Sequence, residues 1–247
     1  MPGVAELTLD QISHRRFDLI EQKIDGSRHT YQNGKIVSDR GIDRSKDRFP
    51  HIVKQLAELD IHCRGEVAIP DGNVLQLNAS LNWHRAKFYI FDLYSVKGLD
   101  FSKAGVLQQR KALEAIVAHN PHLSNVLIPP KFASFGEGWD HIKANALEGI
   151  ILKNDNGSIF KIKHMKELKA PIVGYEPGST KGAFIVDWNG VQCRVSGTSA
   201  DYVQRAHNMI ARGEKPYLEI EYLFRTEDGH PFQPRIRRIG TLEQLTS

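Results

Sequence analysis

The sequence Lys23-Ile-Asp25-Gly26-Ser-Arg28 places an amine two residues before an acid–glycine turn and an arginine just beyond it. A lysine amine is a nucleophile only when it is neutral, and its ordinary pKa of about 10.4 leaves little neutral amine at pH 7. Neighbouring positive charge or burial lowers that pKa. In such surroundings Lys23 could attack a phosphate, whereas on an open surface it would be an ordinary charged side chain.

Three further motifs follow in order, centred on Phe91, on Glu148 and on the pair Lys161 and Lys163. If the fold brings them together, the two lysines would supply the positive field that activates Lys23. They would also stabilise the charge that develops on a phosphate under attack. Glu148 is a hard oxygen ligand that suits Mg²⁺ or Mn²⁺, and the ring of Phe91 could stack on a base.

Two arginines complete a set of residues that describes nucleotidyl transfer. Arg28 and Arg40 could clamp phosphate or ribose oxygens, while a lysine attacks an α-phosphate and keeps the nucleotide as a phosphoramidate. Each motif also fits a purely structural role: Phe91 in a core, the Glu148 motif in a turn, and the later lysines on the solvent face of a strand. The occurrence of all four patterns in order, at strand or turn positions, favours the catalytic interpretation.

Hydrophobic patterns place these motifs on strands and turns. Periodicity and β-branched or aromatic content predict strands over 17–23, 87–94, 149–153 and 159–163. The turn pair Asn33-Gly34 predicts a hairpin over 28–37. Apolar residues at helical spacing predict helices over 49–59 and 107–120. The lysines and Phe91 are therefore expected on strands.

After residue 169 the pattern changes to short strands separated by turns, with one helix over 200–212. The strands are predicted over 172–175, 183–187, 191–195 and 217–224. About five strands and a helix in a short segment are typical of an OB-fold. The sequence thus predicts an α+β protein, with mixed antiparallel sheets and helices over 1–169 and a C-terminal OB-fold β-barrel over 170–247.

Composition restricts the class of protein. The 247 residues are 40% hydrophobic and 25% charged, which is ordinary for a soluble globular protein. Apolar runs are too short to span a bilayer, and the first residues lack the apolar stretch of a secretory signal. A cytoplasmic protein with no membrane partner is expected. Cys63 and Cys193 have no metal-ligand spacing and are expected to be reduced packing residues.

Positive charge is distributed unevenly along the chain. The formal net charge is +4, and basic residues gather in three clusters, over 40–48, 161–169 and 235–238. Separate basic clusters on a folded chain suit a polyanionic partner such as a nucleic acid.

The motifs resemble, in order, those of the ATP-dependent DNA ligase family within the covalent nucleotidyltransferases. The matching segments are Lys23-Ile-Asp-Gly-Ser-Arg28, Arg64-Gly-Glu66, Phe91-Asp92, Glu148-Gly-Ile-Ile-Leu-Lys153 and Lys161-Ile-Lys163. Residues 173–178, Gly182 and residues 227–238 resemble the OB domain of the small, minimal members, which have no separate DNA-encircling domain. The resemblance implies that residues 1–169 are an adenylation (nucleotidyltransferase) domain.

The resemblance also implies a role for each matching position. Lys23 would be the adenylated lysine, and Glu148 would bind the metal. The residues that would bind the nucleotide are Glu21 at the adenine amino group, Phe91 stacked on adenine, Glu66 at the ribose, Arg28 at the nucleotide and the 3′-OH side of a nick, and Lys161 and Lys163 at the α-phosphate.

Two positions depart from the family pattern. The family has Ser-Arg before a glycine downstream of the first motif, whereas this chain has Ser38-Asp39-Arg40-Gly41. Arg40 is our choice for the arginine that binds a 5′-phosphate, and Arg44 is the alternative. The acid–glycine–glutamate turn of the family is altered to Arg64-Gly65-Glu66, with the glutamate kept.

The implied activity is that of an ATP-dependent DNA ligase, which seals 3′-OH/5′-phosphate nicks through a lysyl-AMP intermediate and an adenylated 5′-phosphate. It would act as a monomer with ATP, Mg²⁺ or Mn²⁺ and nicked double-stranded DNA. The basic tail, Arg235, Arg237 and Arg238, is expected to approach ATP in one pose of a mobile OB domain and DNA in another.

Three alternatives share part of this pattern. An RNA ligase uses the same lysine chemistry. A capping guanylyltransferase fits less well, because residues 148–153 follow the ligase version of that motif. A nucleic-acid-binding module that has lost catalysis would be expected to lack Lys23 or Glu148, and both are present.

Overall fold

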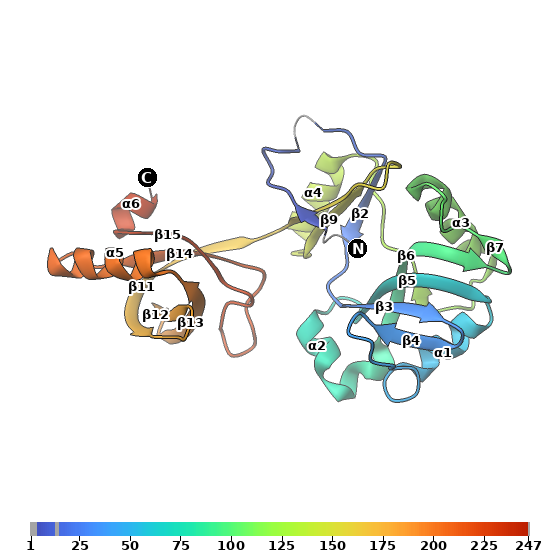
Figure 1. Ribbon diagram of the computed structural model, residues 1–247, viewed down its shortest axis with the longest axis horizontal. Helices are drawn as coiled ribbons and strands as arrows, with labels where there is room; N and C mark the ends of the chain where they lie inside the picture. Colours follow the sequence, from blue (N-terminus) through green and yellow to red (C-terminus); the bar gives the residue numbers. More distant parts are fainter. Residues whose placement is uncertain (1–3, 13–14, 247) are drawn as a thin grey trace. The chain divides into compact units, whose positions relative to one another are not determined.

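A computed structural model describes residues 4–12 and 15–246 of the chain (Figure 1). The chain divides into two compact units, residues 1–163 and residues 164–247. Antiparallel sheets form the framework of both units. The prediction that residues 1–169 and 170–247 are separate domains stays a prediction. Among the described residues, no helix is long and apolar enough to cross a membrane.

The larger sheet of the first unit has the strand order β4-β3-β5-β6-β7, with β8 parallel to β6 and the other neighbours antiparallel. Its strands are β3 (Ser27–Gln32), β4 (Lys35–Ser38), β5 (Ile61–Ala68), β6 (Lys87–Val96), β7 (Leu99–Asp100) and β8 (Val126–Leu127). β3 and β4 form the predicted hairpin, in which Asn33 and Gly34 both have positive φ. A two-residue type I′ turn requires that conformation at both positions.

Helices and short helical turns complete the core of this sheet. They are α1 (Pro50–Ala57), α2 (Val74–Asn78), the 3-10 helix η1 (Ser80–Arg85) and α3 (Val106–His119). Ile52 and Leu56 of α1 and Leu113 of α3 are buried in one cluster with Phe88 and Ile90 of β6. Pro50 begins α1, where its missing N–H leaves no helical hydrogen bond unmade.

The smaller sheet of the first unit has the strand order β1-β10-β9-β2. Its strands are β1 (Ala5–Glu6), β2 (Leu19–Lys23), β9 (Gly149–Lys153) and β10 (Ile159–Lys163). Helix α4 (Phe135–Ala144) packs against it, and Ile142 of α4 is buried with Ile150, Leu152 and Ile162. This sheet carries Lys23, Lys161 and Lys163, and Glu148 directly precedes β9.

The second unit is a five-stranded antiparallel sheet in the order β13-β12-β11-β14-β15. Its elements are β11 (Lys166–Glu176), β12 (Gly182–Trp188), β13 (Val191–Thr198), α5 (Ala200–Ala211), β14 (Tyr217–Tyr222), β15 (Arg235–Gly240) and α6 (Leu242–Thr246). Met209 of α5 is buried with Phe184, Val195 and Leu218 of the sheet. No strand pairing joins β13 to β15 among the described residues, so the predicted closed barrel is not confirmed.

Candidate active site

One glycine brings two of the predicted lysines together. Gly149 begins β9 and is paired with Lys23 of β2 on one side and with Lys163 of β10 on the other. Gly149 has a φ of 153°, and a Cβ atom there would lie 2.0 Å from the carbonyl oxygen of Ile162. Only glycine fits this close approach, which places both lysines beside the preceding residue, Glu148.

The carboxylate of Glu148 lies between the two lysines. Lys23 Nζ donates to Glu148 Oε2 at 2.6 Å, and Lys163 Nζ lies 3.5 Å from Oε1. Glu148 is 8% exposed and Lys23 is 21% exposed, so the amine is the more accessible partner. Burial lowers the pKa of Lys163 against the opposing effect of Glu148, and the charge of Lys23 adds to the decrease.

Lys161 lies two residues before Lys163 on the same strand, and it has a different partner. Its Nζ lies 3.7 Å from Glu6 Oε2 on β1, which runs parallel to β10. The structure therefore brings Lys163 to the carboxylate beside Lys23, whereas Lys161 is paired at the edge of the sheet.

Two further carboxyls share the electrostatic surroundings of Lys23 and Glu148. Burial raises the pKa of Glu66 to about 8, with Lys23 opposing the increase and Glu148 adding to it. Burial and Glu148 raise the pKa of Asp25 to about 6, against the effect of Lys23. Gly26 holds the turn of Asp25 against β5, since a Cβ atom there would lie 2.2 Å from the carbonyl oxygen of Val67.

The donor set around Glu148 fits a divalent cation that is held mainly by a substrate. In the part of the chain that the structure describes, no three Asp, Glu, His or Cys side chains converge as a metal site. Magnesium at nucleotide sites is commonly bound by one or two carboxylates together with phosphate oxygens and water. Glu148 could supply such a carboxylate. Asp25 and Glu66 are further carboxyls in its surroundings, and their pKa values are raised mainly by burial and to a lesser degree by the charge of Glu148.

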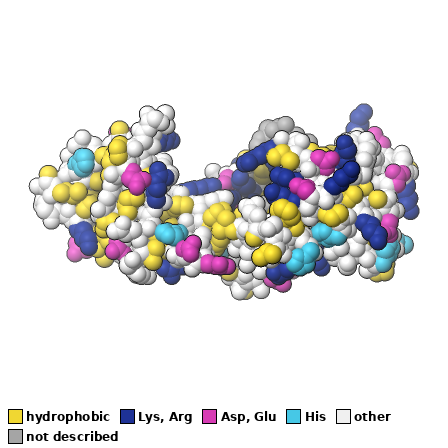
Figure 2. Space-filling view, turned by 90° about the horizontal axis from the view of Figure 1, so that it is seen from below, with side chains coloured by type: hydrophobic (Ala, Val, Ile, Leu, Met, Phe, Trp, Pro, Cys, Tyr) yellow, Lys and Arg dark blue, Asp and Glu magenta, His cyan; other side chains and the backbone are white. Residues whose placement is uncertain are grey.

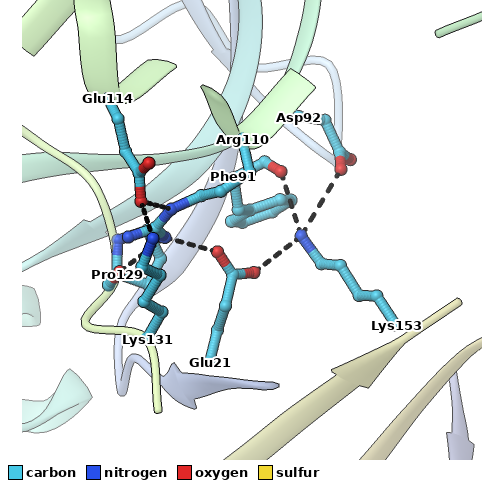
Figure 3. A network of polar contacts seen from close by, with 8 residues as sticks. All are labelled: Glu21, Phe91, Asp92, Arg110, Glu114, Pro129, Lys131 and Lys153. Atoms are coloured by element: carbon cyan, nitrogen blue, oxygen red, sulfur yellow. Dashed lines mark hydrogen bonds and ion pairs between the residues drawn. The ribbon is translucent and has the colours of Figure 1, made fainter. Parts of the chain in front are cut away.

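Glu21 lies at the centre of a buried network of charges (Figure 3). Its Oε1 accepts a hydrogen bond from Arg110 Nη1 at 2.6 Å, and its Oε2 lies 2.9 Å from Lys153 Nζ. Arg110 also donates to the carbonyl oxygen of Pro129 at 2.7 Å, and Lys153 donates to that of Phe91 at 3.0 Å. Burying a charge is costly unless it is paired, and contacts with two cationic side chains fix Glu21 in place.

The network continues on both sides of Glu21. Lys153 Nζ lies 3.9 Å from Asp92 Oδ1 and 5.4 Å from the centre of the Phe91 ring. Burial raises the pKa of Asp92, and Lys153 opposes this increase. On the other side, Glu114 accepts from Arg110 at 3.0 Å and pairs with Lys131 at 2.7 Å. Lys153 thus links the backbone of Phe91, the predicted base-stacking residue, to the carboxylate of Glu21, the predicted base-reading residue.

Several arginines line one cleft of the first unit, among them Arg28 of β3, Arg64 of β5, and Arg40 and Arg44 of the segment after β4. Arg28 Nε donates to Asp39 Oδ2 at 2.5 Å, and Arg64 Nη2 lies 3.6 Å from Asp39 Oδ1. Arg40 is exposed, and Arg44 pairs with Asp47 at 2.9 Å. Both remain candidates for the residue that binds a 5′-phosphate.

A cleft of about 1540 Å³ in the first unit joins these groups. This volume exceeds the roughly 300–1,000 Å³ of ordinary small-molecule pockets, which leaves room for a nucleotide and part of a second substrate. The predicted residues that line it are Glu21, Lys23, Arg28, Arg40, Glu66, Phe91 and Lys161. Glu148 does not line it but contacts Lys23 directly, and Lys163 contacts Glu148.

Sequence reasoning gave no role to Arg110, Lys153, Asp25 or Asp39. Arg110 and Lys153 carry a usable signal, because each is a charge in a buried position. Arg110 lies three residues before the buried Leu113 on α3, and Lys153 ends an apolar strand. A charge at a core position usually has a buried partner, although the sequence does not show which.

The basic residues expected to approach ATP and DNA lie on β15 of the second unit. Arg237 pairs with Glu221 at 3.0 Å, and Arg238 pairs with Glu219 at 2.7 Å. Figure 2 shows basic and acidic side chains next to one another on the face in view, without one broad area of a single sign. Any polyanion contact on this strand would therefore compete with these acidic neighbours.

The fold is similar to that of solved ATP-dependent DNA ligases. No family model and no curated protein matches the sequence, but solved structures match at probability 1.00. A Lig E DNA ligase, studied for DNA binding with a minimal scaffold, matches with a TM-score of 0.71 and 14% identity over 97% of this chain and 100% of its own. The predicted resemblance to the ligase family is thereby confirmed at the level of fold.

Two other ligase structures agree. A mycobacterial DNA ligase D complexed with ATP and MES matches with a TM-score of 0.51 and 17% identity, over 91% of this chain and 89% of that one. The Chlorella virus DNA ligase-adenylate matches with a TM-score of 0.50 and 17% identity, over 97% of this chain and 99% of that one. Identities this low establish the fold, and the activity has to be argued from the site.

Proposed function

We propose that the protein is an ATP-dependent DNA ligase that seals 3′-OH/5′-phosphate nicks in duplex DNA through a lysyl-AMP intermediate. The observation that carries this proposal is the position of Lys23 on the cleft, with its amine 2.6 Å from Glu148 and with Lys163 on the other side of that carboxylate. The likeness in fold to ATP-dependent DNA ligases supports it.

In the first step, Lys23 Nζ loses a proton to solvent, and the neutral amine attacks the α-phosphate of ATP. A phosphorus–nitrogen bond forms, the bond between the α-phosphorus and its bridging oxygen breaks, and pyrophosphate leaves. Glu148 orients the amine through its hydrogen bond, and Lys161 and Lys163 stabilise the added negative charge. A divalent cation held by Glu148, when bound, would neutralise phosphate oxygens further.

In the later steps, the 5′-phosphate of a nick attacks the lysyl phosphorus and takes the AMP, which frees the lysine. The 3′-OH then attacks the activated 5′-phosphate, a phosphodiester bond forms, and AMP leaves. Arg28 would orient the nucleotide and the 3′-OH side, and Arg40 or Arg44 would hold the 5′-phosphate.

The base end of the nucleotide site would lie between Glu21 and Phe91. An ionised carboxylate only accepts hydrogen bonds, so Glu21, held by Arg110 and Lys153, suits an exocyclic amino group such as that of adenine. Glu66, on β5, would hold the ribose. This arrangement supports ATP as the substrate, and one ligase of the same fold was solved in complex with ATP.

We also propose that the second unit is an OB domain that contacts DNA. Five antiparallel strands with a helix between the third and fourth agree with that fold. The proposed partner is nicked double-stranded DNA, and the proposed acting form is a cytoplasmic monomer.

The test measures covalent label on the protein. The protein is incubated with α-labelled ATP or GTP and Mg²⁺, and then with nicked DNA, nicked RNA or hybrid duplexes. Label from ATP should attach to the wild type and to Lys143→Ala, a control with an exposed lysine, but not to Lys23→Ala. Nicked DNA should then receive the AMP and be sealed.

Three outcomes would reject the proposal or part of it. Label that never attaches, or attaches equally to Lys23→Ala, removes the lysyl-AMP mechanism. Preferential labelling by GTP indicates a capping-type enzyme. Sealing of nicked RNA in preference to DNA indicates an RNA ligase.

A further inference from the structure

Asp39 lies between two arginines on the wall of the cleft. Its Oδ2 accepts from Arg28 Nε at 2.5 Å and also pairs with Arg28 Nη2, while its Oδ1 lies 3.6 Å from Arg64 Nη2. The backbone reinforces this contact, because the amide of Asp39 donates to the carbonyl oxygen of Arg28 at 3.3 Å. One carboxylate thus connects β3, β5 and the segment that follows β4.

Arg64 of β5 faces the same carboxylate, with its Nη2 3.6 Å from Asp39 Oδ1. A change at only one of the two positions would bring like charges together: an arginine at 39 would lie beside Arg28 and Arg64, and an acid at 64 would lie beside Asp39.

We propose that Asp39 is a positioning residue for Arg28 in the nucleotide site, and that the attraction between Asp39 and Arg64 helps to hold Asp39 in place. The first part rests on the proposed function, because the role of Arg28 at the nucleotide belongs to it. Asp39 occupies the Nε–Nη2 edge of the Arg28 guanidinium. The donors on Nη1 are left for a phosphate or ribose oxygen.

The surroundings of Arg28 explain why it needs such a partner. The side chain is 43% exposed, and an exposed arginine samples many rotamers. Arg28 lies opposite Glu66 in the β3–β5 ladder, so a fixed guanidinium would act next to the residue proposed at the ribose. Contact with Asp39 selects a rotamer before the nucleotide binds, which favours correct geometry in the reaction itself.

The test is a double-mutant cycle on lysine labelling by α-labelled ATP in the absence of DNA. Asp39→Ala should lower the maximal labelling rate about tenfold, and the ATP concentration for half-maximal rate should change less than about threefold. Because Asp39 acts through Arg28, the Arg28→Ala/Asp39→Ala double variant should be no slower than Arg28→Ala alone. Asp47→Ala removes an acid paired with a different arginine, Arg44, and should leave this rate unchanged.

Two outcomes overturn the positioning role while the proposed function stands. In one, Asp39→Ala labels at the wild-type rate. In the other, Asp39→Ala slows the Arg28→Ala variant by a further tenfold. A wild type that takes no label from ATP rejects the proposed function and the positioning role together.

The attraction between Asp39 and Arg64 is tested separately by thermal unfolding, which needs no activity. Asp39→Arg and Arg64→Asp should each lower the midpoint temperature, and the double variant with both changes should recover at least half of the larger loss. A double variant whose loss is the sum of the two single losses overturns the pair.

Discussion

The acidic side chains around Lys23 carry their charge in different ways. Glu148 is balanced by two ammonium groups, whereas burial raises the pKa of Glu66 to about 8 and that of Asp25 to about 6. In the free protein at neutral pH, Glu66 is therefore mostly protonated. A protonated carboxyl both donates and accepts hydrogen bonds, which suits the hydroxyl groups of a ribose.

The raised pKa of Glu66 predicts a pH-dependent stability. Between the ordinary value of 4.5 and the folded value of about 8, the folded protein binds more protons than the unfolded chain. The contribution of Glu66 to stability is thus present at low pH and is lost as the pH rises through about 8. The free energy of unfolding of Glu66→Gln minus that of the wild type should therefore increase by more than about 1 kcal/mol between pH 5 and pH 9.

Urea unfolding at several pH values measures this difference. Glu227→Gln changes an exposed carboxyl of the second unit and should show no such trend. A difference between the wild type and Glu66→Gln that stays constant with pH would contradict the raised pKa.

Gly149 offers a second prediction at this scale. Gly149→Ala should cost about 3 kcal/mol or more, because the new Cβ would collide with the carbonyl of Ile162. Gly157→Ala, in the turn of the same hairpin, meets no atom within 4 Å and carries only the strain of a positive φ, about 1 kcal/mol. Equal losses in urea unfolding would show that the close approach at Gly149 is unimportant.

Individual site residues differ in how far the sequence could predict them. Lys23, Arg28 and Phe91 lie on one cleft as the order of motifs indicated. The burial of Glu21 between Arg110 and Lys153 could not be predicted, because these residues come from three elements far apart in the sequence. The same holds for Asp39, whose partners lie on β3 and β5.

At the scale of elements, the hairpins were predictable and several helices were not. Asn33-Gly34 and the turn after residue 153 have strong local turn chemistry, and both hairpins are present. Helix α4 contains Gly136 and Gly138, which lower helix propensity. It forms because tertiary packing supports it: Ile142 is buried on the small sheet, and a side chain at Gly138 would collide with Phe132.

A weak intrinsic propensity makes α4 dependent on its N-cap. Ser134 Oγ accepts a hydrogen bond from the amide of Glu137 at 3.1 Å. Ser134→Ala should therefore cost about 1 kcal/mol, and it should slow lysine labelling because α4 supports β2 and β9. Ser199→Ala removes the equivalent cap from α5 in the second unit and should leave labelling unchanged. Equal labelling rates for both variants would show that the stability of α4 does not affect the reaction of Lys23.

At the scale of the whole molecule, the charge distribution bears on DNA binding. The net charge is only +4, and Arg237 and Arg238 already have acidic partners. Affinity for DNA should depend on several separate phosphate contacts, and it should fall with salt and vary little with sequence. The division into two units was suggested by the change of pattern after residue 169, but the closing of the second sheet depends on edge pairing that local patterns do not specify.

The salt dependence of DNA binding tests one of these contacts. If Arg237 binds a phosphate, Arg237→Met should make the slope of log K against log salt shallower by about 0.9. Arg212→Met removes an exposed arginine paired with Glu214 near the end of α5 and should leave the slope unchanged. Equal slopes for Arg237→Met and the wild type would show that Arg237 does not bind a DNA phosphate.

Each unit contains one buried thiol, Cys63 in the first and Cys193 in the second. Burial raises the pKa of both, so neither reacts readily with maleimides while the protein is folded. The two native cysteines should therefore react little with a thiol-directed dye in the folded protein, and an introduced surface cysteine could be labelled selectively. One cysteine introduced on the surface of each unit would accept a donor and an acceptor dye, and energy transfer between them could follow the distance between the units as ATP and DNA are added.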